Sequence, residues 1–322
     1  MFGLKLRMYL LTIILFAIVY GIVSMLSYSV FGIGDFYFYL ILSLVFMFIQ
    51  YMVGPKLVEW SMRVKYVQEN EYPELHRMVY ELAQKAKIPK PRIGIAQIPL
   101  PNAFAFGRWK SDGRVCVTQG ILNLLSPDEL RAVLGHELTH LKNRDVLFIT
   151  LLSVIPILLY RMAWSLLFFR GGSRRSDSGY VALIGLAAFL FYFITNLLVL
   201  YGSRIREYFA DRGSVALGNS SHQLATALYK LVYGSARMSK DSLKQVEGLK
   251  AFFVNDPSRG LKELHELREL DLDRSGTIDA NELLAIRTKT VKLSFGDRMF
   301  ELMSTHPNML RRIKRLSESE LL

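Results

Sequence analysis

Four long uncharged runs constrain the fold of this chain more than any other feature of its sequence. Residues 8–34, 36–55 and 178–203 contain no charged residue, and residues 146–169 contain only Arg161. A helix needs about 20 apolar residues to cross the hydrocarbon layer of a bilayer, so each run is long enough to span it. A soluble protein of 322 residues would rarely bury four such helices. We therefore predict a predominantly α-helical membrane protein.

The charges beside these runs predict their orientation. Lys5 and Arg7 precede the first run, whereas only Asp35 lies in the turn to the second. Basic residues stay preferentially on the cytoplasmic side, so we expect the N-terminus and the chain after Lys56 to face the cytoplasm. The first run exceeds the apolar core of a signal peptide and offers no small-residue cleavage site, so we interpret it as a retained helix. We expect a multi-pass protein of the cell (inner or plasma) membrane.

The runs also predict four parts of the chain. Residues 1–55 are expected to form two transmembrane helices, and residues 56–145 the first part of a soluble domain. Residues 146–203 are expected to form a hydrophobic helical hairpin, and residues 204–322 the second soluble part. The loop 170–179 contains three arginines, which conflicts with an external location. The hairpin therefore either spans the bilayer or is only partly embedded in it.

Charge and cysteine content exclude several classes of function. The net charge is +12, but the Lys and Arg residues are dispersed and no nucleic-acid-binding motif accompanies them. Anionic lipid headgroups explain basic residues beside membrane helices better, so the expected partner is the bilayer and not nucleic acid. The single cysteine, Cys116, excludes an internal disulfide framework, and its apolar neighbours indicate a buried thiol. The sequence leaves the oligomeric state open.

The first soluble part combines helix and strand patterns. We predict a helix over roughly 70–87 and short strands around 92–98, 103–107 and 114–118, the last preceded by an Asp-Gly turn. These strands indicate a small sheet within an α+β domain.

A strong helix start follows the predicted strands. Ser126 suits an N-cap, Pro127 the first helical position and Glu129 the third position of a capping box. The helical pattern continues to about residue 160, either as one long helix or as two helices joined near Asn143.

The segment His136-Glu137-Leu138-Thr139-His140 lies on this predicted helix. Positions i and i+4 share one helix face, so His136 and His140 can offer imidazole nitrogens to one ion. Glu137 lies beside that face, where its carboxylate can take a proton from water activated by the metal. The pattern is typical of zinc proteases, although five residues can also match by chance on a surface helix.

A third metal ligand is available after the fourth hydrophobic run. Glu207 and Asp211 are also four residues apart on a predicted helix, so Glu207 can complete a zinc site while Asp211 orients a histidine ring. The alternative is a solvated acidic pair among arginines. His140 precedes the third run and Glu207 follows the fourth, so a shared ion requires the chain to return to the same side of the membrane.

Four motifs in order resemble those of the HtpX-type membrane metalloproteases (peptidase family M48), which are related to the CAAX-processing proteases. They are Pro101-Asn102-Ala103-Phe104-Ala105, Gly135-His136-Glu137-Leu138-Thr139-His140, Arg206-Glu207-Tyr208-Phe209-Ala210-Asp211 and Ser304-Thr305-His306-Pro307. The resemblance implies one zinc ion per chain held by His136, His140 and Glu207, with Glu137 as general base and acid. It also implies a zincin-like protease domain in the cytoplasm that acts in protein quality control and stress response on misfolded or damaged membrane proteins.

The resemblance further implies a substrate-binding site. A peptide would pair with an edge strand formed by Asn102, Ala103, Phe104 and Ala105. His306 and Arg312 match positions that face the active site of the family and help hold substrate or the oxyanion. The alternative for His306-Pro307 is an ordinary turn before a helix.

A second metal motif is not part of the family pattern. Residues 271–282 read Asp-Leu-Asp-Arg-Ser-Gly-Thr-Ile-Asp-Ala-Asn-Glu, and their oxygen ligands fall at the positions of an EF-hand calcium loop. Leucines precede the loop and a helical pattern follows it, which predicts a helix–loop–helix over 259–290. The predicted ligands are Asp271, Asp273, Ser275, Thr277, Asp279 and Glu282. The alternative is an acidic turn that binds no ion.

Two functions are therefore compatible with the sequence. The first is a zinc endopeptidase of the membrane, with polypeptides as substrates. The second is a calcium-responsive membrane scaffold or binding protein in which the histidine motif is degenerate.

Overall fold

The computed structural model describes residues 51–98, 100–168, 178–236, 269–288 and 294–318, together with residues 45, 48, 49, 263 and 267. The chain divides into two compact units, each made of two stretches of sequence. One unit contains Met1–Val53 and Leu147–Ile205, and the other contains Gly54–Val146 and Arg206–Leu322. The expected first transmembrane helix and most of the second lie outside the described residues, so these two crossings stay predictions.

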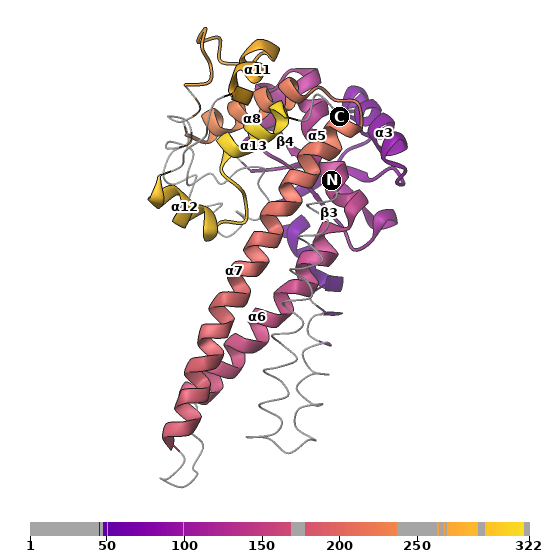
Figure 1. Cartoon of the computed structure of the whole chain (residues 1–322). Helices are drawn as coiled ribbons and strands as arrows, with labels where there is room; N and C mark the ends of the chain where they lie inside the picture. The colour runs from indigo at the N-terminus through magenta and orange to yellow at the C-terminus, as the bar shows by residue number, and fades with distance from the viewer. Residues whose placement is uncertain are drawn as a thin grey trace. The chain divides into compact units, whose positions relative to one another are not determined.

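Two long helices supply most of the described residues of the first unit. Helix α6 (Asp145–Phe168) and helix α7 (Ser178–Ala216) run side by side (Figure 1). Their contact contains buried aliphatic side chains and a tyrosine pair, Tyr160 and Tyr192, with ring centroids 5.3 Å apart. Among the described residues, the segment Tyr180–Ala216 is the one helix long and apolar enough to cross a membrane.

The break between α6 and the preceding helix decides between the two alternatives for this region. Helix α5 (Pro127–Asn143) begins with the predicted capping box, in which Ser126 and Glu129 each accept the other's backbone N–H. It ends at Arg144, whose left-handed conformation (φ 57°) stops the helical hydrogen-bond pattern. Two helices therefore meet at Arg144, one residue beyond the predicted junction.

The second unit contains the expected small sheet. The strands are β1 (Val64–Tyr66), β2 (Arg92–Ala96), β3 (Ala103–Phe106) and β4 (Arg114–Thr118), in the order β1-β2-β4-β3. The central pair β2 and β4 is parallel, and the two outer pairs are antiparallel. Strand β1 was not predicted. Cys116 on β4 is fully buried and burial raises its pKa to about 12, which agrees with an inert thiol.

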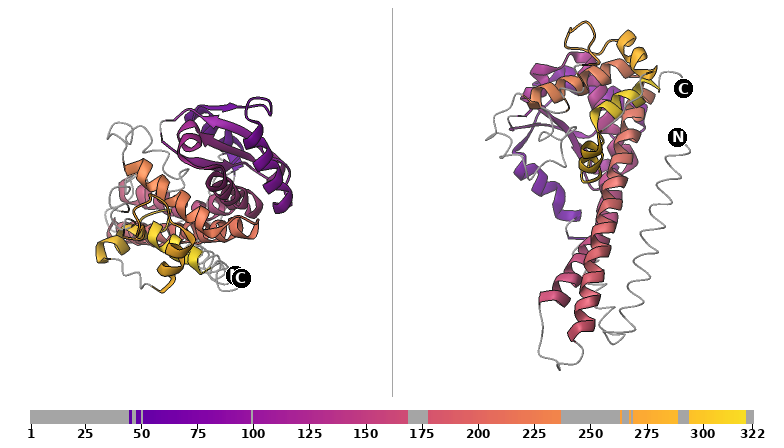
Figure 2. Two further views of the ribbon diagram at one scale, coloured as in Figure 1. Left: turned by 90° about the horizontal axis from the view of Figure 1, so that it is seen from above. Right: turned by 60° about the vertical axis from the view of Figure 1, so that its left-hand side comes forward.

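Helices cover this sheet and build the main core of the second unit (Figure 2). Helix α5 packs against α3, α8 and strand β3, and α13 packs against α8 and α11. The fold is thus predominantly helical with one small mixed sheet among the described elements, as predicted. The remaining elements are α3 (Pro73–Ala86), a short 3₁₀ turn η1 (Lys110–Asp112), α4 (Gln119–Leu124), α8 (Ser221–Ala236), α11 (Ala280–Thr288), α12 (Phe295–Leu302) and α13 (Met309–Ser317).

Glycines allow α5 and the last turns of α7 to approach closely. A Cβ added to Gly213 would lie 2.2 Å from Thr139 Cγ2 and 2.8 Å from Thr139 Cβ. A Cβ added to Gly135 would lie 2.3 Å from Asn219 Nδ2. Ser214 strengthens the contact because its hydroxyl donates a 2.6 Å hydrogen bond to the Ala132 carbonyl. A Cβ does not fit at Gly213, and at Gly135 it would require the Asn219 and Ser214 side chains to move.

We predict that Gly213→Ala destabilises the protein by about 1–3 kcal/mol, because the added methyl overpacks a buried contact. Rotation of the Thr139 side chain cannot relieve the clash, since the Thr139 Cβ itself lies too close. Chemical denaturation of the purified protein measures this change.

Gly296→Ala on α12 is the matched control, because a Cβ there meets only Ser294 Oγ at 3.8 Å. Helix propensity should make this control neutral or stabilising by up to about 1 kcal/mol. Equal stability of the two variants would contradict the proposed tight crossing.

Candidate metal centre

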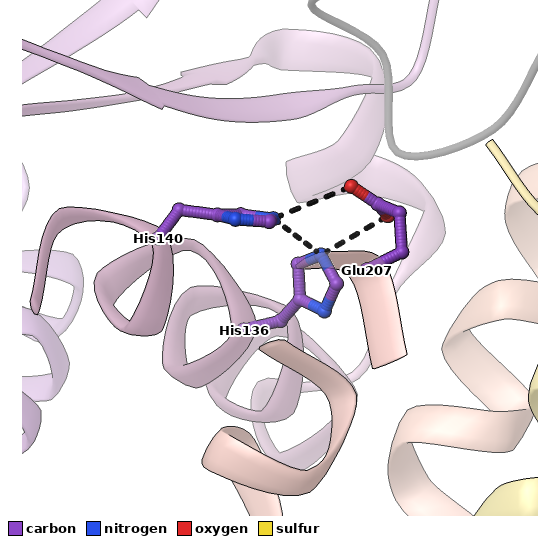
Figure 3. Close-up of side chains that lie close together, drawn as sticks. All are labelled: His136, His140 and Glu207. Carbon is purple, nitrogen blue, oxygen red and sulfur yellow. Dashed lines mark hydrogen bonds and ion pairs between the residues drawn. The ribbon is translucent and has the colours of Figure 1, made fainter. Parts of the chain in front are cut away.

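Three side chains converge where α5 and α7 cross (Figure 3). His136 and His140 project from one face of α5, and Glu207 projects from α7. The two Nε2 atoms lie 3.1 Å apart, and the Glu207 carboxylate oxygens lie 3.6 Å from His136 Nε2 and 3.5 Å from His140 Nε2. The structure thus brings together the three residues that the sequence predicts as ligands.

The separations fit a tetrahedral metal ion. Zinc–nitrogen and zinc–oxygen bonds of about 2.1 Å place tetrahedral ligand atoms about 3.4 Å apart, close to the observed distances. Two imidazoles and one carboxylate are also the donor set of catalytic zinc sites that keep one position for water or substrate. The three residues therefore fit a divalent metal ion.

Each histidine is oriented by a carboxylate behind it. His136 Nδ1 lies 2.9 Å from an oxygen of Asp211, the residue predicted for this role. His140 Nδ1 lies 2.6 Å from Asp145 Oδ2, a contact that sequence reasoning missed. Because each Nδ1–H is held by a carboxylate, the lone pairs of both Nε2 atoms point into the same small space. Such an arrangement is stable only with a cation or protons between them.

The surrounding charges balance a divalent cation. The ligand Glu207 and three further buried carboxylates carry four negative charges, and two buried guanidinium groups offset two of them when the histidines are neutral. A divalent ion neutralises this excess in a region that water does not screen. The carboxylates belong to Glu137, Asp145, Glu207 and Asp211, and the guanidinium groups to Arg206 and Arg312.

The pKa shifts reflect the same charges. Burial favours the neutral imidazole of His136, but the hydrogen bonds and charges of Asp211 and Glu207 outweigh it and raise its pKa to about 10. Burial likewise favours a protonated Glu207, but the charges of His306 and Arg312 dominate and hold its pKa well below the usual range. Protons and a metal ion therefore compete for the same atoms.

Arg312 closes the site on one side. Its side chain is fully buried and forms two hydrogen bonds to Asp211, at 2.9 and 2.6 Å, and an ion pair with Glu207 at 3.2 Å. The structure therefore places this predicted residue against the ligand set, where it fixes both acidic side chains.

His306 also reaches the site. Its Nδ1 lies 3.4 Å from Glu207 Oε2, and neither ring nitrogen has a hydrogen-bond partner among the described residues. It precedes Asn308, which caps the N-terminus of α13 through its side chain. His306 is therefore both part of a turn before a helix and a neighbour of the metal ligands.

The predicted substrate strand borders the same site. Residues Ala103–Phe106 form β3, which is at the edge of the described sheet and packs against α5. The carboxylate of Glu137 accepts a hydrogen bond from the backbone N–H of Ala105. Asn102 precedes the strand, and its carbonyl accepts the N–H of Thr118 on β4. The backbone groups of alternate residues, Ala103 and Ala105, therefore point away from β4.

The loop predicted to bind calcium forms a separate group. One carboxylate oxygen from each of Asp271, Asp273 and Glu282 lies within 4.8 Å of the other two. None of these residues belongs to the group of His136, His140 and Glu207.

Comparison with known proteins places the chain in a class of enzymes. The family model of peptidase family M48 matches residues 69–320. A protease HtpX homolog of Methanothermobacter thermautotrophicus is 53% identical over 229 residues, which cover 71% of this chain and 86% of that protein. A protease HtpX homolog of Thermoplasma acidophilum is 32% identical over 325 residues, which cover 99% of this chain and 98% of that protein. The chain therefore belongs to peptidase family M48, as the sequence motifs indicate, and is a membrane metalloprotease of the HtpX type.

A solved structure agrees with this fold. The crystal structure of S. mikatae Ste24p resembles the present structure with a TM-score of 0.51 at 15% identity, covering 98% of this chain and 67% of that one. At this identity the likeness concerns the fold alone.

We predict that Asp145→Asn weakens metal binding about 10- to 100-fold, because the amide no longer holds the His140 ring with a full negative charge. Competition for the metal with a chromophoric chelator measures the change. Asp211→Asn should weaken binding at least as much, since Asp211 also holds Arg312.

Asp128→Asn is the matched control, because Asp128 is exposed in the first turn of the same helix. Metal affinity unchanged in Asp145→Asn, or reduced equally in the control, would contradict the role assigned to Asp145.

Proposed function

We propose that the protein is a zinc-dependent endopeptidase that cleaves misfolded or damaged proteins, including membrane proteins. The convergence of His136 Nε2, His140 Nε2 and the Glu207 carboxylate carries this proposal. Bound zinc would lower the pKa of a water molecule and polarise the scissile carbonyl. Proton transfer and the positioning of substrate are proposed to depend on side chains around these ligands.

Glu137 is the proposed general base and acid. It follows His136 directly on α5 and is 5% exposed. Burial raises its pKa, which brings the carboxyl nearer to the range in which it can accept a proton at neutral pH and return it. The hydrogen bond from the Ala105 N–H keeps the carboxylate at the edge of β3. In this role Glu137 takes a proton from the attacking water and gives it to the leaving amine.

His306 and Arg312 have different proposed roles. His306 Nδ1 faces Glu207, and its Nε2 has no hydrogen-bond partner among the described residues, which suits a donor to the substrate carbonyl as its oxygen becomes negative. Arg312 already pairs with Asp211 and Glu207 and has no exposed surface. It is therefore proposed as a positioning residue rather than as a group that touches substrate.

The first test is Glu137→Gln, which keeps the size of the side chain but removes its basic oxygen. We expect casein cleavage to fall about 10²- to 10⁴-fold, the usual contribution of general base catalysis, while zinc content stays at one ion per chain. Cleavage is measured together with zinc by elemental analysis.

Glu74→Gln on α3 is the control, because Glu74 is an exposed carboxylate on a different helix. Cleavage retained in Glu137→Gln would contradict its role as a base. Wild-type protein with neither zinc nor activity would favour the alternative of a membrane scaffold.

Substrate is proposed to bind by pairing with β3. The outward backbone groups of Ala103 and the carbonyl of Ala105 can pair with a further antiparallel strand, whereas the Ala105 N–H already donates to Glu137. An extended peptide in this place would present its backbone to the metal ligands.

A scan of N-methylated peptides tests this pairing. Methylation removes one backbone donor at a time, so cleavage efficiency should fall about 3- to 10-fold at alternate residues and little between them. Measurements of kcat/KM on one cleavable peptide and its methylated forms give the pattern. A uniform decrease along the peptide would argue against strand addition.

The membrane arrangement is proposed from the charges of the sequence. Lys5 and Arg7 before the first hydrophobic run favour a multi-pass protein with its protease unit in the cytoplasm of the cell. A role in quality control of membrane proteins fits this location and the HtpX-type relatives.

A further inference from the structure

We propose that the loop Asp271–Glu282 binds one calcium ion, at a site distinct from the zinc ligands. The loop supplies oxygen ligands only, which is the donor set of a hard cation such as calcium. It leads directly into α11, whose first residue is Ala280.

The backbone of the loop has the conformation that the motif requires. Gly276, at the sixth position, has a φ of +79°, a left-handed value that favours glycine. Ile278, at the eighth position, is fully buried in the main core. The loop is thus folded with Ile278 inward and with Asp271, Asp273 and Glu282 close together.

The acidic side chains are close enough to share one ion. One oxygen of Asp271, one of Asp273 and one of Glu282 lie within 4.8 Å of one another. Asp279 is near as well, because its Oδ1 accepts the Glu282 N–H and its own N–H donates to Glu282 Oε2. Four carboxylates within twelve residues repel one another unless a cation lies between them.

Asp271 provides an independent observation that points to a cation ligand. Its side chain is 7% exposed, and its Oδ1 is buried without a hydrogen-bond partner among the described residues. Its other oxygen accepts hydrogen bonds from the Gly276 N–H at 2.9 Å and from the Tyr229 hydroxyl at 3.2 Å. A buried carboxylate oxygen without a partner is costly, and a cation at the first ligand position removes that cost.

The loop is anchored to α8 through Ile278 and Asp271. Thr226 Oγ1 donates to the Ile278 carbonyl at 2.8 Å and accepts the Ile278 N–H at 3.0 Å. With the Tyr229 contact, α8 therefore holds the loop at two points. Helix α8 in turn packs against α5 and α13, which carry His136 and Arg312 (Figure 1). Calcium bound here would stabilise the helices behind the metal centre.

The test is calcium titration of the full-length, zinc-loaded protein in detergent by calorimetry and thermal unfolding. We expect one calcium ion per chain with a Kd between about 10⁻⁶ and 10⁻³ M, the range of sensor loops and extracellular modules. Calcium at one hundred times Kd should raise Tm by about 5 °C, and magnesium at equal concentration should raise it much less.

Two variants separate binding from folding. Glu282→Gln removes the last ligand, but Glu282 also accepts the backbone N–H groups of Leu272 and Asp279, so this variant can lose stability without calcium. Asp273→Asn is milder, because Asp273 is exposed. We expect Asp273→Asn to keep the calcium-free Tm within about 1 °C and to weaken calcium binding at least about 10-fold.

Glu318→Gln is the matched control, because Glu318 is exposed at the end of α13 and its loss should leave calcium binding unchanged. No heat of binding and no Tm shift at 10 mM calcium (about ten times the weakest expected Kd) would overturn the proposal. Equal calcium binding by wild type and by Asp273→Asn and Glu282→Gln would also overturn it, since the ion would then bind elsewhere.

Discussion

The metal centre depends on two imidazole lone pairs that are held towards each other. The carboxylates of Asp211 and Asp145 accept hydrogen bonds from the Nδ1–H groups of His136 and His140, so both Nε2 atoms face the same point. Glycines at the crossing of α5 and α7 bring Glu207 to that point. The helices therefore fix the distances between ligands, and the carboxylates behind the histidines fix their direction.

The same contacts explain why so many charges are buried in one place. Arg312 and Arg206 offset part of the negative charge of the acidic residues, and the remainder corresponds to one divalent ion. Removal of any one member would leave its partner buried without compensation, which costs several kcal/mol in proteins. The cluster is therefore a unit whose members have to be understood together.

The sequence predicted the parts of this site that follow from local periodicity. His136 and His140 share a helix face because they are four residues apart, and the capping box at Ser126 indicated where that helix begins. Glu207 was predicted because it lies four residues before Asp211 on a helix that follows the fourth hydrophobic run. Asp145 was missed because the left-handed Arg144 breaks the helical period between it and His140. The pairing of Arg312 with Asp211 joins residues 101 positions apart, a contact that no local pattern encodes.

The fold shows a similar division. Strands around 92–98, 103–107 and 114–118 were predicted, and β2, β3 and β4 lie within these ranges, whereas β1 has only three residues and no clear alternation. The spacing of oxygen ligands in the loop Asp271–Glu282 could be read directly from the sequence. Its attachment to α8 could not, because Thr226 and Ile278 are 52 residues apart.

The position of Arg312 late in the chain affects the order in which the site can assemble during synthesis. A chain is synthesised from its N-terminus, so the histidines emerge first, Glu207 and Asp211 later, and Arg312 last of all. Until α13 emerges from the ribosome, the two acidic residues lack the guanidinium group that makes their burial favourable. The ion pairs that hold Asp211 and Glu207 therefore form only after α13 has been synthesised.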